Sequence, residues 1–219
     1  GEQGQVDEAD KAWEDLANNF AAADQLDDIL GEWAYLNLQH ERYERADEVY
    51  RRLLTKFPDS PHAGQARLSL AESKMQAGDL DTALSEFTTI ATDRNYAELA
   101  REPALYHVID ISAAQRKWPD VLRFANLFVN EFSASTHASK VQLFYGEGHL
   151  GQGNLPEAER VLQTLRKGVQ DGQLAAADWT ERIWVVLAEI ALARKQYTDI
   201  DSLASELIDR SPNSRFLFQ

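Results

Sequence analysis

Apolar residues recur at helical spacing along the chain, and the same pattern returns at a regular interval. In the first complete copy, Tyr43 is followed by Ala46 three residues later and by Tyr50 four residues after that. This spacing places the three side chains on one face of an α-helix. Later copies of the pattern begin at Leu80, Trp118, Leu155 and Tyr197. The steps between copies are 37, 38, 37 and 42 residues, which predicts a stack of similar helical units.

Glycine and proline mark where the helices of each unit should stop and start. Gly78 and Gly153 stand just before a copy of the pattern, where a left-handed cap suits glycine best. Pro119 and Pro156 fall in the first turn of the following helix, where proline is tolerated. The polar segment Gly168–Leu174 accounts for the longest step and is predicted to be a loop. No alternating strand pattern of useful length is present, so the prediction is an all-α chain.

These signals divide the chain into a leading helix and five helix pairs. Residues 1–25 are predicted to hold the second helix of a truncated leading repeat. The five pairs are expected at about 26–62, 63–99, 100–137, 138–176 and 177–213, with the start of a further repeat at the C-terminus. A single pair cannot bury its apolar face, so neighbouring pairs are expected to stack into a solenoid.

The repeat resembles the tetratricopeptide repeat (TPR). That family places a large–small pair in the first helix, then alanine, an aromatic residue and proline at fixed distances. The first copy supplies Trp33-Ala34, Ala46, Tyr50 and Pro58 in this order. The third copy departs most, because Val121 and Ala125 replace the small and aromatic residues. The resemblance covers nearly the whole chain and implies a right-handed superhelical solenoid of antiparallel helix pairs that binds other proteins without catalysis.

The segment 56–63, with the sequence KFPDSPHA, is similar to a narrower group. It looks like the longer repeats of bacterial envelope proteins, of the outer-membrane assembly lipoprotein type or the Tol–Pal-associated periplasmic coordinator type. That resemblance implies a scaffold in the periplasm or elsewhere in the bacterial envelope, and it is compatible with a lipid anchor upstream. A cytoplasmic location is the alternative.

Charge and composition narrow the classes of partner. The chain has 22 Lys and Arg against 36 Asp and Glu, a formal net charge of −14. Such a charge argues against nucleic acid, which needs a basic face, and against anionic lipid. There are no cysteines, which removes disulfides, thiol catalysis and Cys-based zinc sites. No window is apolar enough to span a membrane.

The first helices of the five pairs carry a row of acidic residues. Alignment of the repeats brings one position into line, occupied by Tyr35, Glu72, Asp110, Glu147 and Glu189. The resemblance implies that this position faces the concave groove, between two mainly apolar rows that include Leu68, Tyr106, Leu143, Met75 and Leu150. We therefore predict that the groove binds a peptide with Lys or Arg among apolar residues. The alternative is that these acids only keep the face of an acidic chain hydrated.

Other chemistry finds little support in the sequence. The carboxylate clamp of chaperone-binding relatives needs basic residues on the same faces, and only Lys140 and Arg182 supply them. His62 and His137 lie 75 residues apart on different repeats, so no shared metal is expected, and no cofactor is predicted. The resulting prediction is a non-catalytic scaffold. The competing interpretation is a self-associating repeat module of a larger protein, or a regulatory domain associated with an enzyme.

Overall fold

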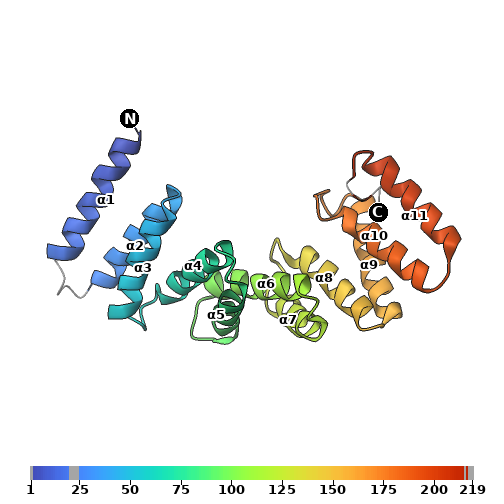
Figure 1. The fold of residues 1–219 in the computed structure, drawn as a ribbon, viewed down its shortest axis with the longest axis horizontal. Helices are drawn as coiled ribbons and strands as arrows, with labels where there is room; N and C mark the ends of the chain where they lie inside the picture. The colour runs from blue at the N-terminus through green and yellow to red at the C-terminus, as the bar shows by residue number, and fades with distance from the viewer. Residues whose placement is uncertain (1, 20–24, 215, 217–219) are drawn as a thin grey trace. The chain divides into compact units, whose positions relative to one another are not determined.

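The computed structural model describes the backbone of residues 2–19, 25–214 and 216, and the side chains from Val6 onward. Every regular element in that described part is an α-helix (Figure 1). The helices are α1 (Glu2–Asn19), α2 (Leu26–Gln39), α3 (Tyr43–Lys56), α4 (Ala63–Gln76), α5 (Leu80–Thr92), α6 (Glu98–Ala114), α7 (Trp118–Glu131), α8 (Ala138–Gly151), α9 (Leu155–Gln170), α10 (Glu181–Ala193) and α11 (Tyr197–Arg210). The all-α solenoid predicted from the repeat is confirmed.

The chain forms two compact units, Gly1–His107 and Val108–Gln219, and the boundary falls within α6. In the first unit α1 packs on α2, α2 on α3, α3 on α4 and α4 on α5. In the second unit the same holds from α7 to α11, and α8 also contacts α10. Contact between alternate helices is the feature that turns a row of helix pairs into a continuous stack.

The first helix of every pair ends in the same way. Five equivalent residues adopt a positive φ, namely Glu41, Gly78, Arg116, Gly153 and Lys195. In the second repeat, Gly78 N–H donates to Met75 O at 3.0 Å and Asp79 N–H donates to Lys74 O at 2.9 Å. The other four helices close with the same two bonds, which define the Schellman motif. The predicted stops at Gly78 and Gly153 are confirmed, and the remaining three repeats make this turn without glycine.

The predicted loop over Gly168–Leu174 is partly wrong. Helix α9 continues through Gly168 to Gln170, and the irregular segment begins at Asp171. The residue that leaves the helical conformation is Gly172, with φ +71°. Leu174 N–H then bonds to Gly168 O at 2.9 Å and folds the segment back over the helix end.

Large side chains from neighbouring helices fill the core of each unit. In the first unit, Trp33 from α2 and Tyr50 from α3 are almost completely buried. In the second unit, Leu162 from α9 packs with Ile183 and Trp184 from α10. Burial of side chains of this size is the main source of stability, each contributing about 2 kcal/mol.

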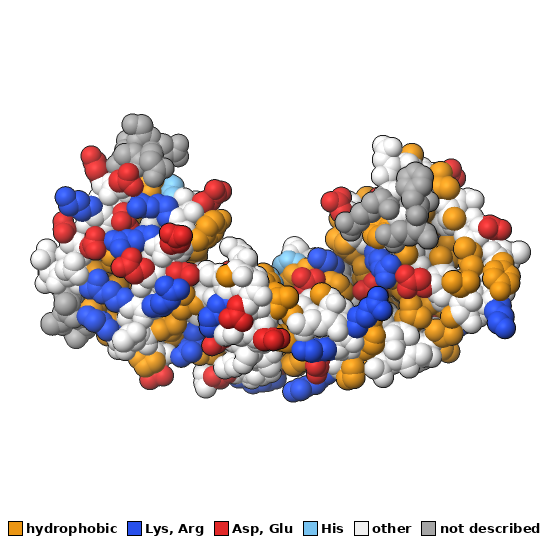
Figure 2. All heavy atoms as spheres, in the orientation of Figure 1, with side chains coloured by type: hydrophobic (Ala, Val, Ile, Leu, Met, Phe, Trp, Pro, Cys, Tyr) orange, Lys and Arg blue, Asp and Glu red, His pale blue; other side chains and the backbone are white. Residues whose placement is uncertain are grey.

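A buried carboxylate ties α1 to the next two helices. Asp10 accepts hydrogen bonds from Trp33 Nε1 at 2.6 Å and from Asn37 Nδ2 at 3.0 Å, and it pairs with Arg45 at 3.3 Å and Arg42 at 3.6 Å. Burial alone would raise the pKa of Asp10, but these hydrogen bonds and the two arginine charges outweigh it and lower the pKa. Figure 2 shows acidic and basic side chains interleaved over this part of the molecule.

Candidate functional site

The second unit contains an open groove lined by parts of α6, α8 and α10 and by Trp118, which begins α7. We call it the polar groove; its cavity has a volume of about 760 Å³. The lining residues are Asp110, Ala113, Ala114, Arg116, Trp118, Phe144, Glu147, Leu150, Gly151, Arg182 and Glu189. The repeat thus brings four predicted site residues together here, namely Asp110, Glu147, Leu150 and Glu189.

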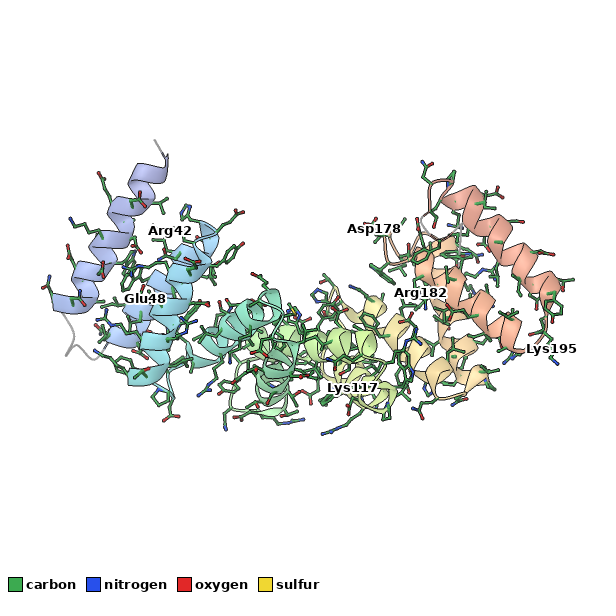
Figure 3. All side chains as sticks on the ribbon, viewed as in Figure 1. Arg42, Glu48, Lys117, Asp178, Arg182 and Lys195 are labelled. Carbon is green, nitrogen blue, oxygen red and sulfur yellow. The ribbon has the colours of Figure 1, made fainter. Side chains whose placement is uncertain are left out.

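Arg182 connects two acids of the predicted row. Its Nε donates to Glu147 Oε1 at 2.8 Å, across from α10 to α8. Its Nη1 donates to Glu189 Oε1 at 2.9 Å, two turns further along α10. Figure 3 labels Arg182 on α10. The guanidinium therefore compensates the charge of both carboxylates within the protein.

The two carboxylates bound by Arg182 differ in their environment. Burial raises the pKa of Glu147, and the hydrogen bond and positive charge of Arg182 offset part of that rise. The side chain of Glu189 is 44% exposed. Glu147 is therefore part of the packing between α8 and α10, whereas Glu189 remains accessible to a ligand.

Two charges in the polar groove are not engaged by Arg182. Asp110 on α6 has no ion pair or hydrogen bond to its side chain among the residues that the structure describes. Arg116, at the end of the same helix, is exposed. The accessible negative charge of the groove is therefore carried by Asp110 and Glu189.

Aromatic side chains form the apolar wall of the polar groove. Trp118 lies directly on the backbone of Gly151, where an added Cβ would come within 2.3 Å of the indole nitrogen. Phe144 stands nearby with the ammonium of Lys140 5.6 Å from its ring centroid. Gly151 therefore has a packing role, since only a residue without a side chain leaves room for this indole.

The first unit has a smaller and more apolar groove, which we call the apolar groove. It has a volume of about 460 Å³ and is lined by parts of α2, α4 and the start of α6, including exposed Tyr35 and Leu99. His62 contacts Gly31, where an added Cβ would come within 2.7 Å of the imidazole. His62 Nε2 also lies 3.0 Å from Asp28 Oδ1. The histidine therefore joins two repeats through packing and a polar contact.

The other predicted residues of the first unit lie beside a histidine. His107 Nε2 is 3.4 Å from Glu72 Oε1, and its ring stacks on Phe87 with centroids 4.7 Å apart. Tyr106 packs edge-on against His107 at 5.8 Å. Met75 is half-buried on α4. Like Glu147, Glu72 has an internal partner.

Two predicted groove residues belong to the core instead. Leu68 is 3% exposed and Leu143 is 2% exposed. Leu143 packs in the hydrophobic cluster of the second unit with Leu162 and Trp184. The expectation that these leucines line an open groove is therefore wrong, because their position in the helix turns toward the neighbouring helix.

Sequence reasoning did not identify Trp118, Phe144 or Arg116 as groove residues. Trp118 begins a second helix, and the sequence marked it only as the first position of a copy of the repeat pattern. The ion pair between Arg182 and Glu189 could have been predicted, because residues seven apart lie on the same face of a helix, two turns from each other.

Within the described ranges, no group of three or more His, Asp and Glu side chains is placed to hold a metal ion. None of the described helices combines the length and the apolar composition needed to cross a membrane.

Comparison with known proteins agrees with the repeat assignment. Residues 30–60 match the family model of the tetratricopeptide repeat. No match was found among curated protein sequences.

The fold is similar to that of several solved structures. YrrB, described as a TPR protein with an unusual peptide-binding site, aligns at 13% identity and a TM-score of 0.67, over 87% of this chain and 89% of YrrB. BtubC from P. vanneervenii aligns at 14% identity with a TM-score of 0.65, over 98% of this chain and 92% of BtubC. Pseudomonas aeruginosa pilF aligns at 13% identity with a TM-score of 0.62, over 98% of this chain and 97% of pilF. At sequence identities this low, the structural similarity shows a shared fold alone.

Proposed function

We propose that the protein is a non-catalytic interaction scaffold that binds a segment of a partner protein in the polar groove. The observation that carries this proposal is the pairing of an aromatic wall, Trp118 and Phe144, with the accessible carboxylates of Asp110 and Glu189. An aromatic wall provides apolar contact area, and fixed carboxylates select cations. The partner segment is therefore one in which Lys or Arg alternates with apolar residues.

The structure changes which acids should carry this selectivity. Glu147 is already bound by Arg182 at 2.8 Å, so a ligand cation would have to compete with a partly buried ion pair. Asp110 has no internal cation to compete with a ligand among the described residues. Glu189 pairs with Arg182, but its side chain is 44% exposed and can still reach a ligand. We assign cation recognition to these two residues, and we assign to Glu147 a structural role.

The same ion pair supports a non-catalytic role. Glu147 is the groove acid whose pKa is raised, which is a property of many catalytic acids. Here its carboxylate accepts a hydrogen bond from Arg182 Nε at 2.8 Å, so burial in the α8–α10 packing accounts for the raised pKa without a catalytic role.

A panel of immobilised peptides tests the proposed class of partner. Basic–apolar, acidic–apolar and neutral–apolar sequences of equal length would be probed with the full chain at low and moderate salt. We expect capture of the basic–apolar set, weakened by salt because exposed charges are screened. Preferential capture of the acidic or neutral set would reject the proposed selectivity.

We also propose that the protein works in a bacterial envelope, on the basis of the resemblance of segment 56–63. Fractionation of cells that express the full-length natural protein tests this location. Recovery in the cytoplasm would contradict it without affecting the groove.

A second candidate function is self-association through α11. Two large apolar side chains on this helix are exposed, Tyr197 at 62% and Ile208 at 48%. Sedimentation of the wild type beside Tyr197→Ser and Ile208→Ser separates the two functions. A concentration-dependent oligomer that both substitutions dissolve would favour self-association, and a monomer at all concentrations would reject it.

A further inference from the structure

The first unit contains a second cleft, on a different face of α4 from the predicted inner row. It lies between α3 and α4, is closed at one side by α5, and has a volume of about 440 Å³. From α4 it uses positions 67, 70, 71, 73 and 74, and from the residue after the helix position 77, whereas the predicted row uses positions 68, 72 and 75. We call it the cationic cleft. Its lining residues are Asp47, Arg51, Leu54, Arg67, Leu70, Ala71, Ser73, Lys74, Ala77 and Glu86.

Three basic side chains converge on this cleft in a chain of net charge −14. Arg67 has no hydrogen bond or ion pair among the described residues, and its Nε is buried without an acceptor. A buried donor without an acceptor is costly unless a ligand or water satisfies it. Arg67 is therefore the group in this cleft that most clearly lacks a partner.

The acids of the cleft only partly compensate the other two cations. Arg51 is 65% exposed and reaches Asp47 at 3.3 Å, and Asp47 also accepts from Ser73 Oγ at 2.9 Å. Lys74 lies 3.7 Å from Glu86, a long ion pair between half-exposed groups. Such pairs contribute little and can exchange partners at small cost.

The equivalent clefts of the second unit show that the architecture does not require these charges. Between α7 and α8, Asn126 and Gln142 take the places of Arg51 and Arg67, and that cavity is about 180 Å³. Between α9 and α10, Gln163 and Ala191 take the places of Arg51 and Lys74. Each of these two clefts also contains one arginine, Arg160 or Arg166, and that arginine is paired with a glutamate, Glu157 or Glu206. Of these three clefts, the α3–α4 cleft is the one whose arginine, Arg67, has no partner among the described residues.

We propose that the cationic cleft binds an acidic segment of a partner protein. In this arrangement the carboxylate of a Glu or Asp side chain lies at the Arg67 guanidinium. A guanidinium offers a planar fork of donors that matches a carboxylate, and the resulting charge-assisted bonds are stronger than neutral ones.

The walls of the cleft favour a peptide over a polyanion. Leu54 and Leu70 supply apolar surface for the residues that flank the bound carboxylate. A nucleic acid would meet the repulsion of the whole acidic chain, and it needs a wider basic face for counterion release. This site is independent of the polar groove, because it lies in the other unit and takes a ligand of opposite charge.

The test measures binding of a fluorescein-labelled peptide of alternating Glu and Leu, with capped ends, to the full chain by fluorescence anisotropy. We expect saturable binding that Arg67→Gln weakens at least about tenfold, as the loss of a charge-assisted bond implies. Lys74→Gln, at an exposed position, should weaken it by a smaller factor. Lys56→Gln removes the same charge from α3 outside the cleft and should leave the affinity unchanged.

The remaining outcomes overturn the proposal. Absence of saturable binding rejects the site, and equal weakening by Lys56→Gln and Arg67→Gln shows only a general charge effect. Complete displacement of the peptide by a low concentration of inorganic phosphate would identify a small-anion site instead. Circular dichroism of each variant checks the fold, and the exposed Lys74 variant keeps the test decisive if Arg67→Gln fails to fold.

Discussion

Arg182 on α10 donates to Glu147 on α8 at 2.8 Å, joining the first helices of two successive repeats. The same guanidinium reaches Glu189 on its own helix at 2.9 Å. This arrangement divides the acidic row into a structural part and an accessible part. It explains why Glu147 is a poor choice of cation ligand.

Removal of this guanidinium should destabilise the second unit. Arg182→Gln leaves Glu147 partly buried without its cation, and the free energy of unfolding should fall by about 2 kcal/mol. Urea denaturation measures the change. The matched control is Arg160→Gln in the exposed pair with Glu157, which should cost less than about 0.5 kcal/mol. Equal effects of the two substitutions would show that the Arg182 pair has no special structural role.

Three helix ends carry a residue that is strained by its backbone conformation. Glu41, Arg116 and Lys195 have φ values of 58°, 54° and 60°, in the left-handed region that glycine occupies at low cost. Each substitution to Gly should raise the free energy of unfolding by about 0.5–1 kcal/mol. Gly78→Ala, where φ is 84°, should lower it by about 1 kcal/mol. Thermal or urea unfolding that shows no gain for any of the three would contradict the assigned strain.

The buried carboxylate of Asp10 should make the first unit sensitive to acid. Its pKa is lowered in the folded state, so the unfolded chain takes up a proton first as pH falls. The stability that it contributes is complete above its usual pKa of about 3.9 and is lost as pH falls through the lower folded value.

The matching experiment compares the wild type with Asp10→Asn across acid pH. Above about pH 5 the variant should be less stable by about 2 kcal/mol, because Arg45 and Arg42 lose their anion. The difference should shrink below about pH 4. A difference that stays constant down to pH 2 would show that the charge of Asp10 is not the cause.

The contact between Trp118 and Gly151 should control the shape of the polar groove. Gly151→Ala places a methyl group within 2.3 Å of the indole, so the ring must move. We expect a shift in tryptophan fluorescence and weaker peptide binding, with helical content unchanged. Gly153→Ala is the control, since an added Cβ there meets nothing within 4 Å, although φ +76° lowers stability. Unchanged binding by Gly151→Ala would remove Trp118 from the binding wall.

Much of the fold could be predicted because one pattern is repeated five times. The spacing shared by Tyr43, Ala46 and Tyr50 recurs in each pair; Ala46 and Tyr50 are buried in the core, whereas Tyr43 at the start of the helix is 48% exposed. The stops at Gly78 and Gly153 were visible because glycine is the usual left-handed residue. The equivalent Glu41 carried no such signal, since tertiary packing imposes a turn that its own preferences oppose.

The candidate site was less predictable because exposure depends on small rotations of each helix. Leu68 and Leu143 stand only four residues from the acidic row, yet they are buried. The pairing of Arg182 with Glu147 joins residues 35 positions apart, and only the stacking of α8 on α10 brings them together. Sequence periodicity fixes which helix a residue belongs to, but it does not determine which charges neutralise one another.

The most direct test of the account is a titration of a basic–apolar peptide against the wild type, against Asp110→Asn combined with Glu189→Gln, and against one control double variant. Asp209→Asn combined with Asp171→Asn removes the same charge from exposed positions outside the polar groove. The account predicts that the groove variant loses at least about tenfold in affinity, while the control changes less than about twofold. Equal affinity of the groove variant and the wild type would contradict the assignment of the polar groove as the binding site.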